Sequence, residues 1–150
     1  MIALIQRVSE AGVTIEGKLK ASIGIGLLVL IGIGLEDTEE DADWLCKKTT
    51  QMRIFGDEEG KMNLSLKDIQ GDLLVISQFT LHASTKKGNR PSFIDAARPE
   101  QAIPLYEKFI SLCKTELGKE IKTGEFGADM KVNLVNDGPV TIFLDSKNKK

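Results

Sequence analysis

The expected centre of the fold is one apolar run, LLVLIGI, at residues 27–33. The run is far shorter than the roughly 20 apolar residues of a membrane-spanning helix. A continuous apolar stretch of this length, without alternation, is typical of a strand that is buried on both faces. The glycines beside it, Gly24, Gly26 and Gly34, lack the GxGxxG spacing of a dinucleotide-binding loop. We therefore expect a central strand at 27–33, with the glycines at bends of a curved sheet.

Shorter strand patterns lie on both sides of this run. The side chains of residues 2–8 alternate with a period of two, and Glu16-Gly17-Lys18 has the composition of a hairpin turn. Residues 136–139 have turn composition as well, and we expect them to join the last two strands. Besides the central run, the expected strands are residues 2–8, 13–15, 19–23, 73–76, 130–135 and 140–144.

Two long helices complete the expected fold. The first begins near Asp37 or Thr38, and Asp37 and Glu40 have the spacing of a capping pair. The second runs from Pro99 or Ala102 to residue 117 and ends at a glycine. Because the strands precede and follow the helices rather than alternate with them, we predict an α+β fold. It has a curved, barrel-like sheet with the two main helices packed on it. The inward stripe of the first helix is Ala42, Leu45, Thr49 and Met52.

The composition is that of one globular domain covering residues 1–150. Hydrophobic residues make up 41% of the chain and charged residues 28%, which excludes a disordered protein. The net charge is −2, so any contact with nucleic acid has to be local. The first residues do not have the pattern of a signal peptide. We therefore expect a cytoplasmic protein, with residues 147–150 as a frayed basic tail.

Few side chains are suited to nucleophilic, acid–base or metal chemistry. Cys46 and Cys113 lie in helical segments and are expected to pack in the core. With His82 as the only histidine, a structural zinc site is excluded, and we expect no metal and no cofactor. On an extended chain Thr80 and His82 point the same way, so a Thr–His pair is conceivable. An ordinary polar loop residue is the simpler interpretation of His82.

Two polar segments stand out. The first, SQFTL at residues 77–81, follows a buried strand directly, so its polar groups are well placed to face a pocket on a rigid support. The second, NDGPVT at residues 136–141, contains a Gly-Pro bond. A cis bond is accessible there because the trans preference of X–Pro is only about 0.5–1 kcal/mol. A plain hairpin turn is the alternative interpretation of the second segment.

Both strings, in this order, are highly specific for one family. The chain closely resembles the D-aminoacyl-tRNA deacylases, also called D-tyrosyl-tRNA deacylases, over essentially its whole length. The segments that carry the resemblance are MIALIQRV (1–8), GKMNL (60–64), SQFTL (77–81), RPSF (90–93), ADM (128–130) and NDGPVT (136–141).

The resemblance implies a homodimeric hydrolase with a barrel-like fold. Members cleave the ester between tRNA and a D-amino acid or glycine, including glycine mischarged on tRNA(Ala), and so keep D-residues out of translation. It also implies that Gly138 and Pro139, joined by a cis bond, enter the pocket of the partner subunit and exclude L-amino acids. The other implied site residues are Ser77, Gln78, Phe79 and Thr80 in the catalytic pocket, Arg7 and Asn136 in support of the Gly-Pro segment, and Phe126 and Met130 beside the terminal adenosine.

The physical chemistry of the reaction agrees with a site that lacks a catalytic triad. An aminoacyl ester is already activated, so donors for the developing oxyanion are the main requirement, and backbone N–H groups near Phe79 and Thr80 are the candidates. The 2′-hydroxyl of the terminal ribose would help to position or activate water. Two alternatives stay open: Thr80 as a covalent nucleophile in an esterase, and a module that binds the tRNA acceptor end without cleaving it.

The expected partners are D-aminoacyl-tRNA, glycyl-tRNA and a second copy of the chain. Lys86, Lys87 and Arg90 in the long polar loop are the candidate phosphate contacts, although a solvated loop explains them as well. We expect neither a membrane nor DNA as a partner.

Overall fold

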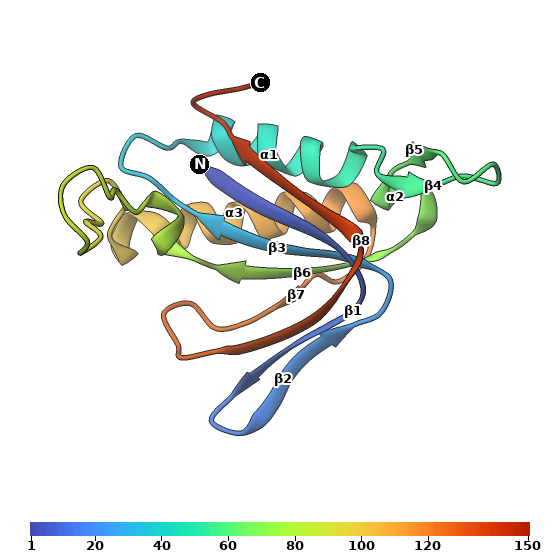
Figure 1. Cartoon of the computed structure of the whole chain (residues 1–150), viewed down its shortest axis with the longest axis horizontal. Coiled ribbons are helices and arrows are strands. Elements are labelled where there is room, and N and C mark those ends of the chain that lie inside the picture. Colours follow the sequence, from blue (N-terminus) through green and yellow to red (C-terminus); the bar gives the residue numbers. More distant parts are fainter.

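The structure, a computed structural model, describes residues 1–150 and contains one curved six-stranded mixed sheet (Figure 1). The strands of this sheet are β1 (Ile2–Ile15), β2 (Lys18–Ile23), β3 (Gly26–Gly32), β6 (Asp72–Ser77), β7 (Lys122–Thr123) and β8 (Lys131–Asp145). Their order is β2-β1-β3-β6-β7, and β8 also pairs with β1. A small separate sheet consists of β4 (Phe55–Gly56) and β5 (Met62–Leu64).

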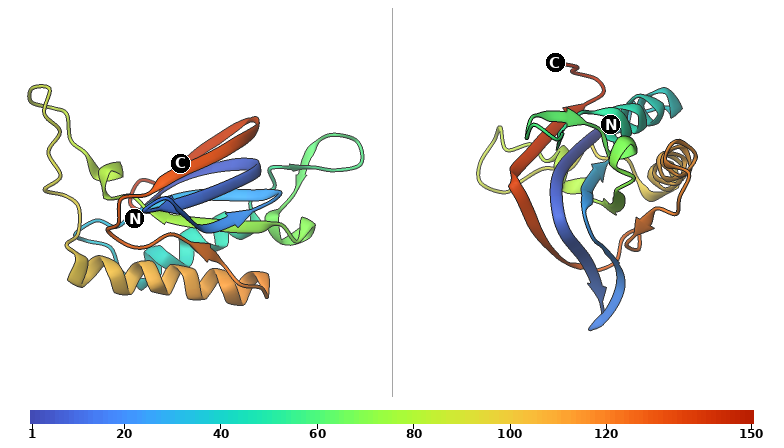
Figure 2. Two further views of the ribbon diagram at one scale, coloured as in Figure 1. Left: turned by 90° about the horizontal axis from the view of Figure 1, so that it is seen from below. Right: turned by 90° about the vertical axis from the view of Figure 1, so that its right-hand side faces the viewer.

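The helices lie on one side of the large sheet, opposite to β8 (Figure 2). The two long helices, α1 (Glu39–Gln51) and α3 (Pro99–Leu117), pack against each other. The remaining helical elements are short: α2 (Leu66–Ile69) and the 3-10 turn η1 (Phe79–His82). The expected α+β fold with a barrel-like sheet and two main helices is confirmed. No helix of the chain combines the length and the apolar character needed to cross a membrane.

The long strand β1 explains why the sheet curls. Its first half pairs with β3, from Ile2 opposite Gly32 to Val8 opposite Gly26, and its second half pairs with β2. Along the other edge, nearly the whole of β1 pairs with β8. The β1–β8 register shifts between Gln6 and Val8 and again between Val8 and Glu10. Such bulges increase the local twist, so the sheet wraps around itself instead of lying flat.

The central position of β3 confirms the expectation for residues 27–33. This strand is antiparallel to β1 and parallel to β6. Leu27, Val29 and Ile31 belong to the core between the sheet and the helices, whereas Leu28 belongs to a second core inside the curl. A strand with cores on both faces needs apolar side chains at successive positions, which is the pattern that the sequence carries.

The expectation of two separate final strands was wrong. Residues 131–145 form one strand, and both of its halves pair with β1. Residues 136–139 are therefore a bulge within β8 and not a hairpin turn. In the same way, the strands expected at 2–8 and 13–15 are both parts of β1. A bulge interrupts the two-residue periodicity as a turn does, and the local sequence does not distinguish the two.

The start of α1 also differs from the expected Asp37–Glu40 pair. The N-cap is Thr38, whose backbone N–H donates to Asp41 Oδ2 at 2.8 Å. The carboxylate of Asp37 is buried and accepts hydrogen bonds from the Met1 amino group and from the Gly34 N–H. Asp37 is thus occupied in joining the first strand to the β3–α1 loop.

The basic tail is held in place at its first residue, Lys147. Its ammonium group lies 2.8 Å from Asp41 Oδ2, and the following Lys149 places Nζ 5.0 Å from the centre of the Trp44 ring. The last residue, Lys150, is exposed. The tail therefore contacts α1 along part of its length.

Candidate functional site

A cavity of about 630 Å³ opens at the carboxyl end of β6, and we call it the β6 cavity. Its wall is formed by the end of β6, by the loop that precedes α3 and by the loop that precedes β8, which approach the same end of the sheet (Figures 1 and 2). Most of its lining is apolar. The predicted site residues that line it are Ser77, Gln78, Phe79, Phe126 and Met130.

Parallel pairing with β3 supports this part of the site rigidly. Residues Leu73–Ile76 are buried, and the pairing with β3 continues to Ser77 opposite Ile31. The Gln78 N–H then donates to the Ile31 carbonyl at 2.7 Å. Beyond Gln78 the chain leaves the sheet and enters η1. The polar residues are thus attached directly to the best-packed part of the fold.

The turn at η1 leaves two backbone donors free. The N–H groups of Phe79 and Thr80 make no hydrogen bond to any acceptor of the chain. Phe79 lines the β6 cavity, and Thr80 follows it directly, outside the lining. Free, rigidly held N–H groups are the kind of donor that stabilises a developing oxyanion.

The Thr80–His82 pair that an extended chain would allow does not form, because residues 79–82 are the 3-10 turn η1. Thr80 is exposed, does not line the β6 cavity, and its hydroxyl accepts a hydrogen bond of 2.5 Å from the Gln78 amide. His82 lines a different cavity, of about 400 Å³, together with Gly34 and Met1. A Cβ on Gly34 would lie 2.8 Å from the His82 ring, which shows how tightly the imidazole is packed there. No imidazole base is therefore paired with the Thr80 hydroxyl.

Aromatic side chains frame the cavity. Phe79 and Phe93 meet edge to face, with ring centres 5.1 Å apart, and Phe126 meets Tyr106 in the same way at 5.6 Å. The Tyr106 hydroxyl donates to the Val75 carbonyl at 3.2 Å, and burial raises the pKa of Tyr106 to about 12. Tyr106 is thus a neutral support for Phe126.

Met130 lies against Gly124. A Cβ at Gly124 would lie 2.4 Å from Met130 Sδ, so the thioether would have to shift if this residue carried a side chain. Phe126 and Met130 both belong to the apolar lining of the cavity, the kind of surface on which a flat ring packs.

The Gly138–Pro139 bond is cis. Both residues are exposed, and neither lines the β6 cavity of its own chain. Arg7 braces the segment: its Nε donates to the Asp137 carbonyl at 2.8 Å and its Nη1 to the Ile54 carbonyl at 2.7 Å.

Asn136 closes the same bulge from the other side. Its Oδ1 accepts from the Val140 N–H at 2.8 Å, and its Nδ2 donates to the Thr141 hydroxyl at 3.0 Å. With Arg7 and Asn136 both engaged, the Gly-Pro segment is a stiff projection on the outside of the protomer.

Lys86, Lys87 and Arg90 lie in an exposed loop and do not line the β6 cavity. The loop is closed by two backbone hydrogen bonds between Ser84 and Ser92, of 2.8 and 2.9 Å. The structure adds Arg98, a cation in the cavity wall that the sequence interpretation missed. Its one local signal is its position at the end of the polar loop, just before the proline that begins α3.

The remaining reactive side chains do not form a catalytic group. Cys46 and Cys113 are both buried in the core. A hydrogen bond with Cys46 and burial raise the pKa of the Cys113 thiol far above its ordinary value, which makes it a poor nucleophile. Nowhere do three or more His, Cys, Asp or Glu side chains gather as they would around a metal ion. The cavity therefore offers hydroxyl, amide and backbone groups, with Arg98 and Asp129 as its charges.

Comparisons with known proteins agree on the relationship. A family model described as D-Tyr-tRNA(Tyr) deacylase matches residues 4–145. Proteins named D-aminoacyl-tRNA deacylase from Cytophaga hutchinsonii and Flavobacterium johnsoniae are 66% and 63% identical over 150 residues, with complete coverage of both chains. A solved structure titled c-Myc DNA Unwinding Element Binding Protein has a TM-score of 0.90 at 43% identity, covering 97% of this chain and 98% of that one. This chain belongs to the D-Tyr-tRNA(Tyr) deacylase family of hydrolases.

Proposed function

We propose that this protein hydrolyses the ester bond of D-aminoacyl-tRNA to release the free D-amino acid and tRNA. Family membership supports the reaction class. The observation that carries the mechanism is the pair of unbonded backbone N–H groups at Phe79 and Thr80, on the edge of a cavity without a catalytic triad.

In this mechanism the main chain supplies the catalytic donors. Water attacks the ester carbonyl, and the Phe79 and Thr80 N–H groups bind the negative charge that develops on its oxygen. A single oxyanion donor is worth about 10²–10³ in rate in enzymes of this kind. The tRNA 2′-hydroxyl, adjacent to the ester, orients the attacking water. Ser77 and Gln78 complete the polar wall, and Phe126 and Met130 hold the terminal adenine between them.

Chiral selection requires a second copy of the chain. Gly138 and Pro139 are exposed and stiff, but they lie outside the cavity of their own protomer. In a homodimer they reach the β6 cavity of the partner, where their carbonyl oxygens occupy the space of an L side chain. A D side chain points outward and is accepted. Glycine has no side chain to reject, so glycyl-tRNA, including glycine on tRNA(Ala), passes the same filter.

Cations of the exposed loop and of the cavity wall serve the tRNA backbone. Lys86, Lys87 and Arg90 extend from the loop before α3, and Arg98 lies in the cavity wall. None of them forms an ion pair with a carboxylate of the chain, so their charge is available to the phosphates of the acceptor end.

Release of tyrosine from D-tyrosyl-tRNA and from L-tyrosyl-tRNA tests the activity. We expect turnover of the D ester and none of the L ester above the spontaneous rate. An intact protein that binds both tRNAs and cleaves neither is a non-catalytic binding module, which is the second candidate function. The support for that candidate is a solved relative whose title names a DNA-binding protein. Competition between duplex DNA and tRNA for binding to this protein tests the candidate.

Action between subunits is tested by mixing two inactive variants. Gly138→Ala damages the projecting segment, and Ala128→Trp fills the β6 cavity, which Ala128 lines. If the sites are shared, each mixed dimer contains one intact cavity facing one intact Gly-Pro segment. Random exchange then restores about a quarter of wild-type activity. If the site is built within one chain, mixing restores nothing, and the homodimer proposal is wrong.

A further inference from the structure

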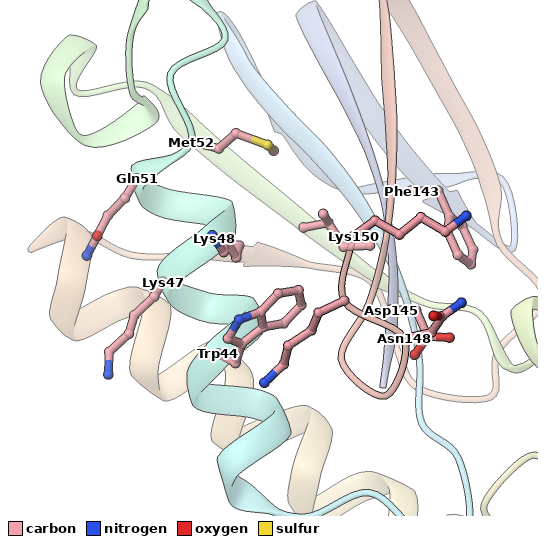
Figure 3. A pocket seen from close by; sticks show the side chains of 11 residues that line it. Trp44, Lys47, Lys48, Gln51, Met52, Phe143, Asp145, Asn148 and Lys150 are labelled. Atoms are coloured by element: carbon pink, nitrogen blue, oxygen red, sulfur yellow. The ribbon is translucent and has the colours of Figure 1, made fainter.

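A second hollow, of about 780 Å³, lies between α1 and the end of the chain (Figure 3). Its lining includes Met52, the residue after α1, Phe143 from β8, Trp44 from α1 and the tail residues 148–150. It shares no residue with the β6 cavity. We call it the Trp44 groove.

Three lysines around this groove have no carboxylate partner. Lys48, Lys149 and Lys150 all line it and form no ion pair, whereas Lys47 pairs with Asp43 at 2.6 Å. Figure 3 shows Lys47 directed away from the groove and Lys150 extended beside Phe143. The only acidic residue in the lining is Asp145. In a chain with a net charge of −2, the lining of the groove carries a local excess of positive charge.

The cations are held together although their segments are far apart in the sequence. Lys48 Nζ lies 5.8 Å and Lys149 Nζ 5.0 Å from the centre of the Trp44 ring, distances at which the face of an indole attracts an ammonium group. A ring does not neutralise the charge as a carboxylate does, so both ammonium groups keep their charge for a ligand.

The tail is anchored just before the groove. Lys147 Nζ lies 2.8 Å from Asp41 Oδ2. Burial of Asp41 would raise its pKa, but the hydrogen bonds from Lys147, Ser146 and Thr38 outweigh this effect and hold the pKa well below its ordinary value. The carboxylate is thus charged at neutral pH, and the tail stays on α1 with Lys149 and Lys150 beside Trp44.

We propose that the Trp44 groove binds phosphate groups of the tRNA away from its acceptor end. This inference rests on the proposed function, in which the acceptor end occupies the β6 cavity. Lysines are point-charge ligands for phosphates, and tRNA is a polyanion long enough to reach beyond one cavity. A second copy of the chain is disfavoured as the occupant, because a symmetric contact would bring the same unpaired lysines together.

The test compares two variants that remove equal charge. Lys149→Gln/Lys150→Gln removes two cations of the groove. Lys18→Gln/Lys20→Gln removes two exposed, unpaired lysines of the β2 hairpin, which lie outside both sites. Binding of uncharged tRNA is measured by fluorescence anisotropy over a series of salt concentrations. We expect the groove variant to bind about 3- to 10-fold more weakly at low salt, with its salt slope smaller by about 1 to 2, and the hairpin variant to stay near wild type.

Hydrolysis separates this inference from the proposed function. With D-tyrosyl-tRNA, the groove variant should show a raised KM and an unchanged kcat. With D-tyrosyl-adenosine, which does not reach the groove, it should match wild type. If wild type cleaves neither substrate but the tRNA-binding difference persists, the proposed function fails and the groove assignment stands. If wild type cleaves both and the two variants bind tRNA alike, the groove assignment is wrong.

Tryptophan fluorescence gives a direct readout, because Trp44 is the only tryptophan in the chain. Its emission should change on titration with tRNA, with the same midpoint as the anisotropy, and should not change in the groove variant. Unaltered emission in the wild type at saturating tRNA would refute the proposal. So would equal binding of duplex DNA with the same salt slope, or dissociation of a dimer in the groove variant by sedimentation.

Discussion

Two polar segments, one at the end of β6 and one within β8, differ in how their backbone groups are bonded. At Ser77–Thr80 the chain leaves the sheet and keeps two backbone N–H groups free at the edge of a cavity. At Asn136–Val140 the chain stays in the sheet as a bulge, and Arg7 and Asn136 bind the groups around the Gly-Pro bond. One segment is open toward a ligand within its own protomer, and the other is a braced projection outside it. Free donors and fixed geometry are thus provided by different parts of the chain.

The largest effect on this comparison is expected at Gly138, in the braced segment. Its φ of +153° is rare for residues with a side chain, and a Cβ there would lie 2.7 Å from the Val140 N. We expect Gly138→Ala to displace the Gly-Pro carbonyls that border the aminoacyl group, so that they obstruct it, and to lower hydrolysis of D-tyrosyl-tRNA by about 100-fold, as a misplacement of about 1 Å in an active site does. Single-turnover rates measure this.

Gly17→Ala is the matched control. Gly17 also has a positive φ, of +76°, but nothing lies within 4 Å of its added Cβ. The alanine variant there has the strain of a positive φ but no clash of its Cβ with a neighbour, so it should hydrolyse D-tyrosyl-tRNA at the wild-type rate. Equal rates for the two variants would show that the geometry of the bulge is not used.

A smaller effect is expected at the brace, Arg7. Its side chain is largely buried and donates to the carbonyls of Asp137 and Ile54. Removing it in Arg7→Ala leaves the part-buried Ile54 carbonyl unpaired, whereas water can reach the exposed Asp137 carbonyl, and should lower the free energy of unfolding by about 1–3 kcal/mol. Denaturant unfolding measures this cost. Arg7→Lys supplies one point charge instead of a fork, so it should fall between wild type and alanine; a lysine variant as stable as wild type would show that the two-carbonyl brace is unimportant.

In the open segment, we expect loss of the Thr80 hydroxyl to lower the rate of hydrolysis less than an added methyl group at Gly138 does. Thr80→Ala removes the hydrogen bond from Gln78 but leaves both backbone N–H groups in place. We expect less than a tenfold fall in kcat, corresponding to about 1 kcal/mol. Rapid-quench analysis should find no acyl-enzyme in the wild type. A trapped ester on Thr80, with activity abolished in the variant, would replace the main-chain mechanism by the covalent one.

The smallest change concerns a third region, the Asp41 contact that joins α1 to the tail. The pKa of Asp41 is lowered in the folded state, so its contribution to stability is present above the unfolded pKa, near 3.9, and is lost as the pH falls through the lower, folded value. Asp41→Asn should cost about 1 kcal/mol at neutral pH, as the loss of a helix cap does, and should flatten the acid limb of the stability curve. Urea unfolding from pH 6 to pH 2 measures both. If stability of Asp41→Asn falls as steeply in acid as that of wild type, another carboxylate is responsible for the loss of stability at low pH.

Local features of the sequence predicted the secondary structure well where each decision depends on neighbouring residues. The apolar run at 27–33 marked the central strand, and Pro99 and Gly118 marked the ends of α3. The polar string after the buried β6 pointed to the cavity wall. The same reasoning kept a Thr80–His82 pair open as an alternative, because local sequence does not show that η1 turns back, and that turn depends on how the segment packs against β3.

What the sequence by itself determined is the class of fold, the positions of the main strands and helices, the polar string at the end of β6 and the resemblance to a family. Only the tertiary structure decided that residues 131–145 are one strand and that Lys149 of the tail meets Trp44. Periodicity and capping depend on residues within a few positions of each other. Strand pairing and convergence of charges depend on which distant segments the packed core brings together, and no local pattern records that choice.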